Sequence, residues 1–380
     1  MIRVKTGLDH LIEVKESLRD LEVGLVVNHT SLTGDFTHLI EVAKNYARKI
    51  VVFAPEHGLS GALPPGATYT NYFDEDYSVE VYSLYGETRE PPQDIVSSLD
   101  CLIYDIQDIG VRCYTYISTL YYCIKSAGKT STPIYVLDRP NPLTGSTIEG
   151  PLVKEEYISF IGIAPIPMRY GLTAGELAEY FNTKYSLGAE VQVYPLEGWK
   201  REMWFDETGL YWIPPSPNIP TLTTALIYVG SVLIEGTNLS EGRGTTKPFE
   251  YIGAPWIKPV DLAKKMNKLN LPGVFFRPVR FTPYTSKYSG KNCGGVHVCV
   301  VNRNTFKPIE TILHLIKLIK NDYSEFEWIK RRGEYFFDLL TGGNKVRLML
   351  EQNCSVEEIA ASWRSDLMKF KEDVEELLMY

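Results

Sequence analysis

Four clusters of polar residues in the first half of the chain carry the side chains that general acid–base chemistry uses. Each cluster directly follows a short apolar run, and together they supply carboxylates, amides, histidines and an arginine. Groups of these types exchange protons with a bound substrate and form hydrogen bonds to it. The clusters are NHT at 28–30, PEHG at 55–58, DIQD at 105–108 and DRPNP at 138–142.

Glu56, in the second cluster, is the strongest candidate for a catalytic group. A carboxyl group at the end of a buried strand can be kept protonated by desolvation, which suits a general acid near neutral pH. The alternative is a loop carboxylate that caps the next segment. The neighbouring His57 is a candidate partner, although a single histidine is more often a packed, hydrogen-bonded residue.

The segment DIQDIGVR at 105–112 brings two carboxylates, an amide and an arginine together. We expect Asp108 to point into the site while Asp105 closes the loop. Gln107 and Arg112 are further candidates for contacts with a substrate, as is Asn28 in the first cluster. The alternative is a local Asp–Arg pair with the side chain–backbone hydrogen bonds of a turn.

Two further loops offer groups for recognition. Arg139 and Asn141 lie in a proline-stiffened loop, where a guanidinium and an amide suit a carboxylate or an N-acyl group. A plain turn is the alternative. The segment EGRGTT at 241–246 follows an apolar helical run and is a candidate to place Glu241 and Arg243 at the same crevice.

The elements that must position these clusters alternate between strands and helices. Continuous apolar runs, typical of a parallel sheet covered on both faces, occupy 23–27, 50–54, 101–104 and 134–137. Helical patterns between them occupy 36–48, 92–99 and 114–127. This order predicts a doubly wound α/β sheet, whose carboxyl edge is where ligands bind.

The remainder of the chain continues this pattern less regularly. Thr173 and Glu176 have the spacing of a capping box that opens a helix to 185, and a strand is expected at 190–194. An apolar helix at 222–235, a helix at 259–269 and strands at 274–282 and 295–301 follow. The composition shifts near residue 253, which predicts a domain of residues 1–253 and a smaller α+β domain of residues 254–380.

Composition limits the classes of function. The 380 residues are 44% apolar and 23% charged, as in an ordinary globular protein, and the net charge of −8 makes a nucleic acid an unlikely partner. No run of about 18 apolar residues predicts a membrane helix. The N-terminal segment lacks the apolar core of an export signal, and six cysteines without a CxxC pair suggest buried free thiols. We therefore expect a cytoplasmic protein.

Several catalytic and cofactor signatures are absent from the sequence. The glycines at 242 and 244 match neither a dinucleotide-binding fingerprint nor a phosphate-binding loop. No HxH or HExxH spacing supports a metal site, and no GxSxG segment offers a serine nucleophile. We expect no cofactor and no metal.

The motifs together resemble a known family. The strings APEHGLSG, YDIQDIGVRCYTYISTL, DRPNPLTG, PSPNIPT, EGTNLSEGRGTTKPFEYIGAPW and FTPYTSKYSGKNCGGVHV occur in order along nearly the whole chain. In this they resemble the exo-β-N-acetylmuramidases of glycoside hydrolase family 171, long described as a domain of unknown function. The resemblance implies a Rossmann-like domain joined to a smaller auxiliary domain that closes a cleft, and removal of N-acetylmuramic acid from the non-reducing ends of peptidoglycan fragments.

The resemblance also assigns roles to residues. The glutamate proposed as catalytic in that family falls on Glu56, which would protonate the glycosidic oxygen. Glycoside hydrolysis usually needs a second carboxyl group, for which we expect Asp108, with Glu241 as its rival. The muramic lactyl carboxylate and N-acetyl group would be bound by Arg112, Arg139 and Asn141.

Tyr114 and Tyr116 would supply stacking or hydroxyl contacts to the sugar ring, if they do not simply pack within a helix. Two other functions stay open at this point. One is a different cleft hydrolase, including a metal-assisted one, and the other is a non-catalytic protein that binds amino sugars.

Overall fold

The computed structural model describes residues 3–380, which divide into two compact units. The first consists of the described part of Met1–Thr147 together with Tyr170–Pro220 and Glu372–Tyr380, and the second of Ile148–Arg169 and Thr221–Lys371. The predicted boundary near residue 253 lies inside the second unit. The reason is that helix α6 (Leu222–Ser231) packs against helix α8 (Pro308–Asp322), far along the chain.

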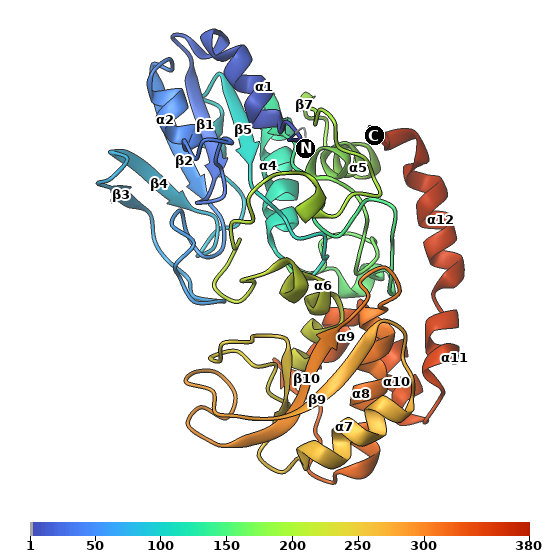
Figure 1. Ribbon diagram of the computed structural model, residues 1–380. Coiled ribbons are helices and arrows are strands. Elements are labelled where there is room, and N and C mark those ends of the chain that lie inside the picture. Colours follow the sequence, from blue (N-terminus) through green and yellow to red (C-terminus); the bar gives the residue numbers. More distant parts are fainter. Residues whose placement is uncertain (1–2) are drawn as a thin grey trace. The chain divides into compact units, whose positions relative to one another are not determined.

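A seven-stranded sheet forms the centre of the first unit, in the order β3-β4-β2-β1-β5-β6-β7 (Figure 1). All neighbouring pairs are parallel except β3 with β4. The strand order reverses between β1 and β5, so the sheet is doubly wound, as the sequence predicts. The strands are β1 (Glu22–Val27), β2 (Lys49–Ala54), β3 (Tyr72–Asp74), β4 (Val79–Ser83), β5 (Cys101–Asp105), β6 (Ile134–Leu137) and β7 (Val191–Tyr194).

Helices cover both faces of this sheet. Helices α1 (Gly7–Glu13) and α2 (Leu39–Lys44) share one core with alternate residues of β1, including Val23, Leu25 and Val27. On the opposite face, Tyr104 of β5 donates a hydrogen bond to the carbonyl oxygen of Tyr116 in α4 (3.1 Å). Helix α4 (Tyr116–Thr130) packs against α3 (Gln93–Val96) and α5 (Ala174–Lys184).

Most of the predicted elements form, with small shifts at their ends. The helix predicted at 36–48 is shorter, because His38 caps it by accepting a hydrogen bond from the Ile40 N–H (3.1 Å) and Phe36 has a positive φ of 66°. The predicted Thr173–Glu176 capping box is confirmed. Helix α1 (7 residues) and the strands β3 (3 residues) and β4 (5 residues) were not predicted, since such short elements give little periodicity.

The second unit is built on a three-stranded antiparallel sheet in the order β8-β10-β9. Helix α7 packs against β9 and β10, while α6 packs against α8. Its elements are β8 (Tyr251–Ala254), α7 (Pro259–Lys268), β9 (Val274–Phe281), β10 (Cys293–Val300), β11 (Lys330–Arg331), β12 (Glu334–Tyr335), α9 (Phe336–Thr341), α10 (Lys345–Glu351) and α11 (Val356–Ala361). Helix α12 (Arg364–Val374) carries the chain back to the first unit.

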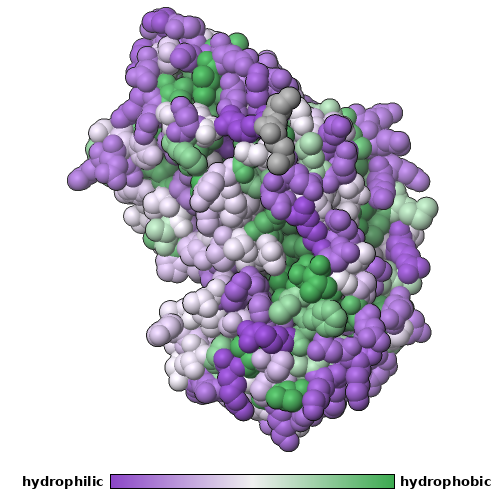
Figure 2. All heavy atoms as spheres, viewed as in Figure 1, coloured by the Kyte–Doolittle hydropathy of each residue, from purple (hydrophilic) through white to green (hydrophobic). Residues whose placement is uncertain are grey.

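Within residues 3–380, no helix is long and apolar enough to cross a membrane. Hydrophilic residues cover much of the face seen in Figure 2. All six cysteines are free thiols, and four of them are buried, as the sequence suggests.

Candidate active site

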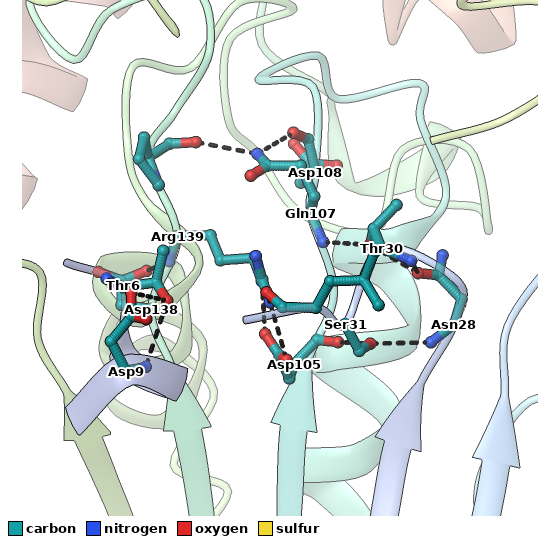
Figure 3. A network of polar contacts seen from close by, with 12 residues as sticks. Thr6, Asp9, Asn28, Thr30, Ser31, Asp105, Gln107, Asp108, Asp138 and Arg139 are labelled. Atoms are coloured by element: carbon teal, nitrogen blue, oxygen red, sulfur yellow. Dashed lines mark hydrogen bonds and ion pairs between the residues drawn. The ribbon is translucent and has the colours of Figure 1, made fainter. Parts of the chain in front are cut away.

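The four polar clusters follow four neighbouring strands of the first unit. The residues after β2, β1, β5 and β6 emerge at the same edge of the sheet because these strands run parallel. Figure 3 shows Asn28, Asp105, Gln107, Asp108 and Arg139 above the carboxyl ends of the strands. This edge, where the strand order reverses, is the place at which open α/β sheets bind ligands.

Glu56 is held at this edge by two hydrogen bonds. Its Oε2 accepts one from the Thr115 hydroxyl (2.6 Å), and its Oε1 accepts one from the backbone N–H of Gly66 (2.9 Å). The side chain is partly exposed, whereas Asp105, Asp108 and Asp138 at the same edge are buried. Glu56 is therefore the one of these four carboxylates that a substrate can reach readily.

Asp108 is a buried carboxyl group with an unusual charge state. One oxygen, Oδ2, accepts hydrogen bonds from the Tyr170 hydroxyl and from the Gly110 N–H (2.6 Å). The other oxygen, Oδ1, is buried without a hydrogen-bond partner among residues 3–380. Burial raises the pKa of Asp108 to about 7, against the pull of these hydrogen bonds. At neutral pH the group is therefore present in both protonation states.

Asp105 and Arg139 form a buried ion pair. Arg139 binds both carboxylate oxygens of Asp105, with a Nη2–Oδ2 distance of 2.9 Å, and Nη2 also donates to the Leu32 carbonyl oxygen (3.1 Å). The Ser31 hydroxyl donates to the Asp105 carbonyl oxygen. These contacts tie together the loops after β1, β5 and β6. The charge of Arg139 is thus already neutralised within the protein.

Asn28 and Gln107 connect the same loops. The Oδ1 of Asn28 accepts from the backbone N–H (2.9 Å) and the hydroxyl (2.6 Å) of Thr30. The Thr30 hydroxyl in turn accepts from the Gln107 N–H (3.0 Å), which links the ends of β1 and β5. The Gln107 side chain donates to the carbonyl oxygens of Asp108 (2.8 Å) and Pro140 (3.0 Å).

Asn141 fixes the loop after β6. Its Nδ2 donates to the Leu172 carbonyl oxygen (2.8 Å), and its Oδ1 accepts from the Leu143 N–H (3.0 Å). Gly110 packs closely on this amide, since a Cβ at position 110 would lie 2.4 Å from the Asn141 Oδ1. Both amide atoms therefore hold the loop in place.

The aromatic and basic candidates after β5 are buried. The hydroxyl of Tyr116 donates to the Pro215 carbonyl oxygen (2.6 Å), and the Tyr114 and Tyr116 rings meet edge to face at 4.9 Å. Arg112 is fully buried, and burial lowers the pKa of its guanidinium. These positions match the packing alternative for the two tyrosines.

The two histidines of the polar clusters form hydrogen bonds to backbone carbonyl oxygens. His57, in a left-handed conformation (φ 72°), binds the Leu63 oxygen through Nδ1 (2.7 Å). His29 binds the Pro214 oxygen through Nε2 (2.8 Å), and burial lowers its pKa. No cluster of three or more His, Cys, Asp or Glu side chains in the described chain is arranged to hold a metal ion.

Glu241 and Arg243 belong to the second unit, where they form their own ion-pair cluster. Glu241 is buried between Lys287 (3.1 Å) and Arg243 (3.4 Å). Arg243 also binds Glu235 (2.8 Å) and lies over the ring of Phe249. The charge of Glu241 is therefore balanced by two cations.

Three contributors to the site were not among the predicted site residues, although Thr115 and Pro215 lie within the family motifs. Thr115 holds Glu56 across 59 positions of the chain, and the carbonyl oxygens of Pro214 and Pro215 hold His29 and Tyr116. A threonine before a helix and a proline-rich loop are common features. Only the fold gives them these partners.

Comparison with known proteins points to one family over the whole chain. The family model described as exo-beta-N-acetylmuramidase NamZ, N-terminal, matches residues 23–223, and the corresponding C-terminal model matches residues 226–380. Peptidoglycan beta-N-acetylmuramidase NamZ of Bacillus subtilis (strain 168) is 42% identical over 382 residues, which cover 100% of this chain and 92% of that protein.

Two solved structures of DUF1343 family proteins from Bacteroides fragilis NCTC 9343 have the same fold. One is 34% identical with a TM-score of 0.91, and each chain is covered completely. The other is 29% identical with a TM-score of 0.77 and covers 100% of this chain and 99% of that chain.

Proposed function

The chain belongs to the exo-β-N-acetylmuramidase NamZ family and is a glycoside hydrolase, and we propose that it uses Glu56 as its general acid to release N-acetylmuramic acid from peptidoglycan fragments. The observation that carries this proposal is the position of Glu56. It is the partly exposed carboxylate among the four at the ligand-binding edge of the sheet. Protonation of the glycosidic oxygen requires a carboxyl group that the substrate can reach.

The hydrogen bonds of Glu56 suit a general acid that must keep one orientation. Thr115 and Gly66 each contact a different oxygen, so the carboxyl plane cannot turn freely. A fixed orientation matters because proton transfer depends on hydrogen-bond distance to the leaving oxygen. The Thr115 hydroxyl is able to reverse its role and accept a hydrogen bond when Glu56 carries the proton.

For the second carboxyl group we propose Asp108. Asp105 is paired with Arg139, and Asp138 accepts hydrogen bonds from the Tyr380 hydroxyl (2.7 Å) and the Gly175 N–H (2.8 Å). Asp108 retains one oxygen without a partner in the described chain and has a pKa of about 7, which is suited to proton transfer near neutral pH.

The contacts of Arg139 and Asn141 support a different role from direct recognition of the lactyl and N-acetyl groups. Both side chains bind other loops of the sheet edge, so we propose that they position those loops beneath the substrate.

The free thiols support a further proposal, a reducing compartment such as the cytoplasm, which fractionation of the host cell would test.

The decisive test is Glu56→Gln assayed on a disaccharide of N-acetylmuramic acid and N-acetylglucosamine, because a sugar leaving group must be protonated to depart. We expect a loss of roughly 10²–10⁴-fold in turnover, the range that general acid catalysis contributes. Glu80→Gln is the matched control, since it makes the same change on an exposed carboxylate of β4. Turnover of Glu56→Gln close to that of the control would remove Glu56 from the acid role.

A panel of chromogenic glycosides tests the substrate. N-acetylmuramic, N-acetylglucosamine and glucose derivatives should be cleaved with a clear preference for the muramic sugar. A preference for N-acetylglucosamine would overturn the substrate assignment and leave hydrolysis standing. Binding of these sugars without release of product would instead identify a non-catalytic amino-sugar-binding protein.

A further inference from the structure

The first unit contains a pocket at the point where the strand order reverses. This β1–β5 pocket, of about 120 Å³, is lined by residues that follow β1, β5 and β6 and by the N-terminal segment. Glu56 is not part of its lining. The polar lining residues that matter below are Arg3, Asp9, Thr30, Thr33, Gln107 and Arg139.

Two exposed aromatic rings stand at this pocket. Phe36 is 56% exposed and Tyr211 is 72% exposed, both line the pocket, and their rings meet edge to face at 5.7 Å. Phe36 has a positive φ of 66°, which is unfavourable for a bulky residue, and its N–H binds the Thr33 carbonyl oxygen (3.1 Å). The fold therefore holds a large apolar ring in solvent at a backbone cost, as is common at binding sites.

The charges in the pocket cancel in pairs. Arg3 binds Asp9 (2.7 Å), and Arg139 binds Asp105 (2.9 Å). Two polar atoms of the lining residues nevertheless have no hydrogen bond within residues 3–380. Arg139 uses Nε and Nη2 for its hydrogen bonds but not Nη1. Gln107 uses its side-chain NH₂ group but not Oε1. Arg139 and Gln107 thus keep one donor and one acceptor without a hydrogen-bond partner in the described chain, and both arginines of the lining are paired with a carboxylate.

A short segment connects this pocket to the surroundings of Glu56. Ile213 lines the pocket, while the next two carbonyl oxygens, of Pro214 and Pro215, accept hydrogen bonds from His29 and Tyr116. Tyr116 directly follows Thr115, the residue that holds Glu56. The segment 213–215 therefore contributes to the lining of the pocket and also contacts Tyr116, the neighbour of the residue that holds Glu56.

We propose that the β1–β5 pocket binds a neutral N-acetylated hexosamine, a sugar of the peptidoglycan fragment other than the one that is cleaved. A pyranose ring has an apolar face for the Phe36 and Tyr211 rings, and its hydroxyl and acetamido groups match an uncharged set of donors and acceptors. The exposed Phe36 and Tyr211 rings would contact the face of the sugar that the pocket does not enclose.

This inference rests on the proposed function for the identity of the fragment. An anionic ligand fits the site less well, since each arginine already has its carboxylate partner. The binding of a neutral sugar here would hold the remainder of the fragment while Glu56 acts at its end. Such a contact would add affinity without entering the chemical step.

The test uses N,N′-diacetylchitobiose, which contains no muramic sugar. It is titrated into the Glu56→Gln variant of the 380-residue chain, and binding is followed by NMR and calorimetry. We expect Tyr211→Ser combined with Phe36→Asn to weaken binding at least 10-fold. Asparagine is chosen at position 36 because it tolerates a positive φ. Phe73→Ser is the matched control, since Phe73 is 59% exposed and lies on the edge strand β3.

Tyr211→Trp should retain binding, because a larger ring preserves the stacking surface, and it guards against loss of folding in the double variant. Absence of chitobiose binding to the parent chain, or equal binding by the double variant and the parent, overturns the proposal. Equal losses in the Phe73 control do so as well. Failure of the catalytic role proposed for Glu56 would give a different result. In that case the Glu56→Gln variant would still hydrolyse the muramic substrate at the parent rate, and it would still bind chitobiose.

Discussion

Replacement of Asp108 by asparagine should change the pH dependence of stability. Relative to the parent chain, the variant should become more stable as the pH rises from acidic to alkaline values. The pKa of Asp108 is raised to about 7 in the folded chain by burial, whereas an unfolded aspartate titrates near 3.9. Between these values the folded state binds more protons than the unfolded state, so stability falls as pH rises. The contribution is greatest below about pH 4 and is lost by the time the pH passes 7.

The magnitude follows from proton linkage. Between pH 5 and pH 8 the unfolded group is already ionised, and the folded group becomes ionised only near the end of that interval. Integration over this range gives a loss of about 3 kcal/mol for the parent chain. Asparagine cannot ionise, so the stability difference between variant and parent should grow by this amount.

The geometry of the site makes asparagine a suitable probe. Its carbonyl oxygen can accept from Tyr170 and Gly110 as Oδ2 does now, and its NH₂ group takes the position of Oδ1, which has no partner in the described chain. A buried NH₂ without a partner costs about 1–3 kcal/mol at every pH. The prediction therefore concerns how the difference in unfolding free energy between variant and parent changes with pH. It does not concern the absolute value of that difference.

The assay is urea unfolding of parent and variant at pH 5 and pH 8, with Asp76→Asn as an exposed control. The free energies of unfolding of variant and parent are compared at the two pH values. If their difference is the same at pH 5 and pH 8 within about 0.5 kcal/mol, the linkage argument is refuted. Turnover measured on the same samples tests the catalytic proposal. A variant that gains stability at pH 8 and loses activity would show that the buried carboxyl group is retained for function.

Two further changes test the contacts that organise the two units. Thr115→Val removes the hydroxyl that holds Glu56, and since a hydrogen bond to a charged group is worth about 1.5–3 kcal/mol, we expect roughly a 10–150-fold loss in kcat/KM, with Thr115→Ser retaining most activity. Lys287→Met leaves buried Glu241 with one cation, so thermal unfolding should show a loss of about 3–5 kcal/mol in the second unit. The double variant with Glu241→Gln should recover part of that stability, and no recovery would contradict the role of the pair.

The sequence alone determined the alternation of strands and helices around the site in the first unit, because these signals are local. Apolar runs of four to six residues report burial on both faces, and the β1, β2, β5 and β6 strands form at or within a residue of the predicted runs. The Thr173–Glu176 capping box depends only on neighbours in the chain and forms as predicted. The polar residues after each strand follow from the same pattern, because parallel strands end at one edge.

Only the tertiary structure decided what each carboxylate at that edge does. Asp105 is paired with Arg139, which lies 34 positions away, and Glu56 is held by Thr115, 59 positions away. Such partners depend on strand order and loop geometry, which no local pattern encodes. The burial that raises the pKa of Asp108 comes in the same way from packing around the loop after β5.

The division into units was likewise set by packing over long distances. The chain leaves the first unit at residue 148, returns at 170 and leaves again at 221, so a single boundary read from composition could not describe it. The motifs in the sequence were sufficient to indicate the family and to single out Glu56. Burial, which depends on every element packed around a side chain, decided which of the neighbouring carboxylates a substrate can reach.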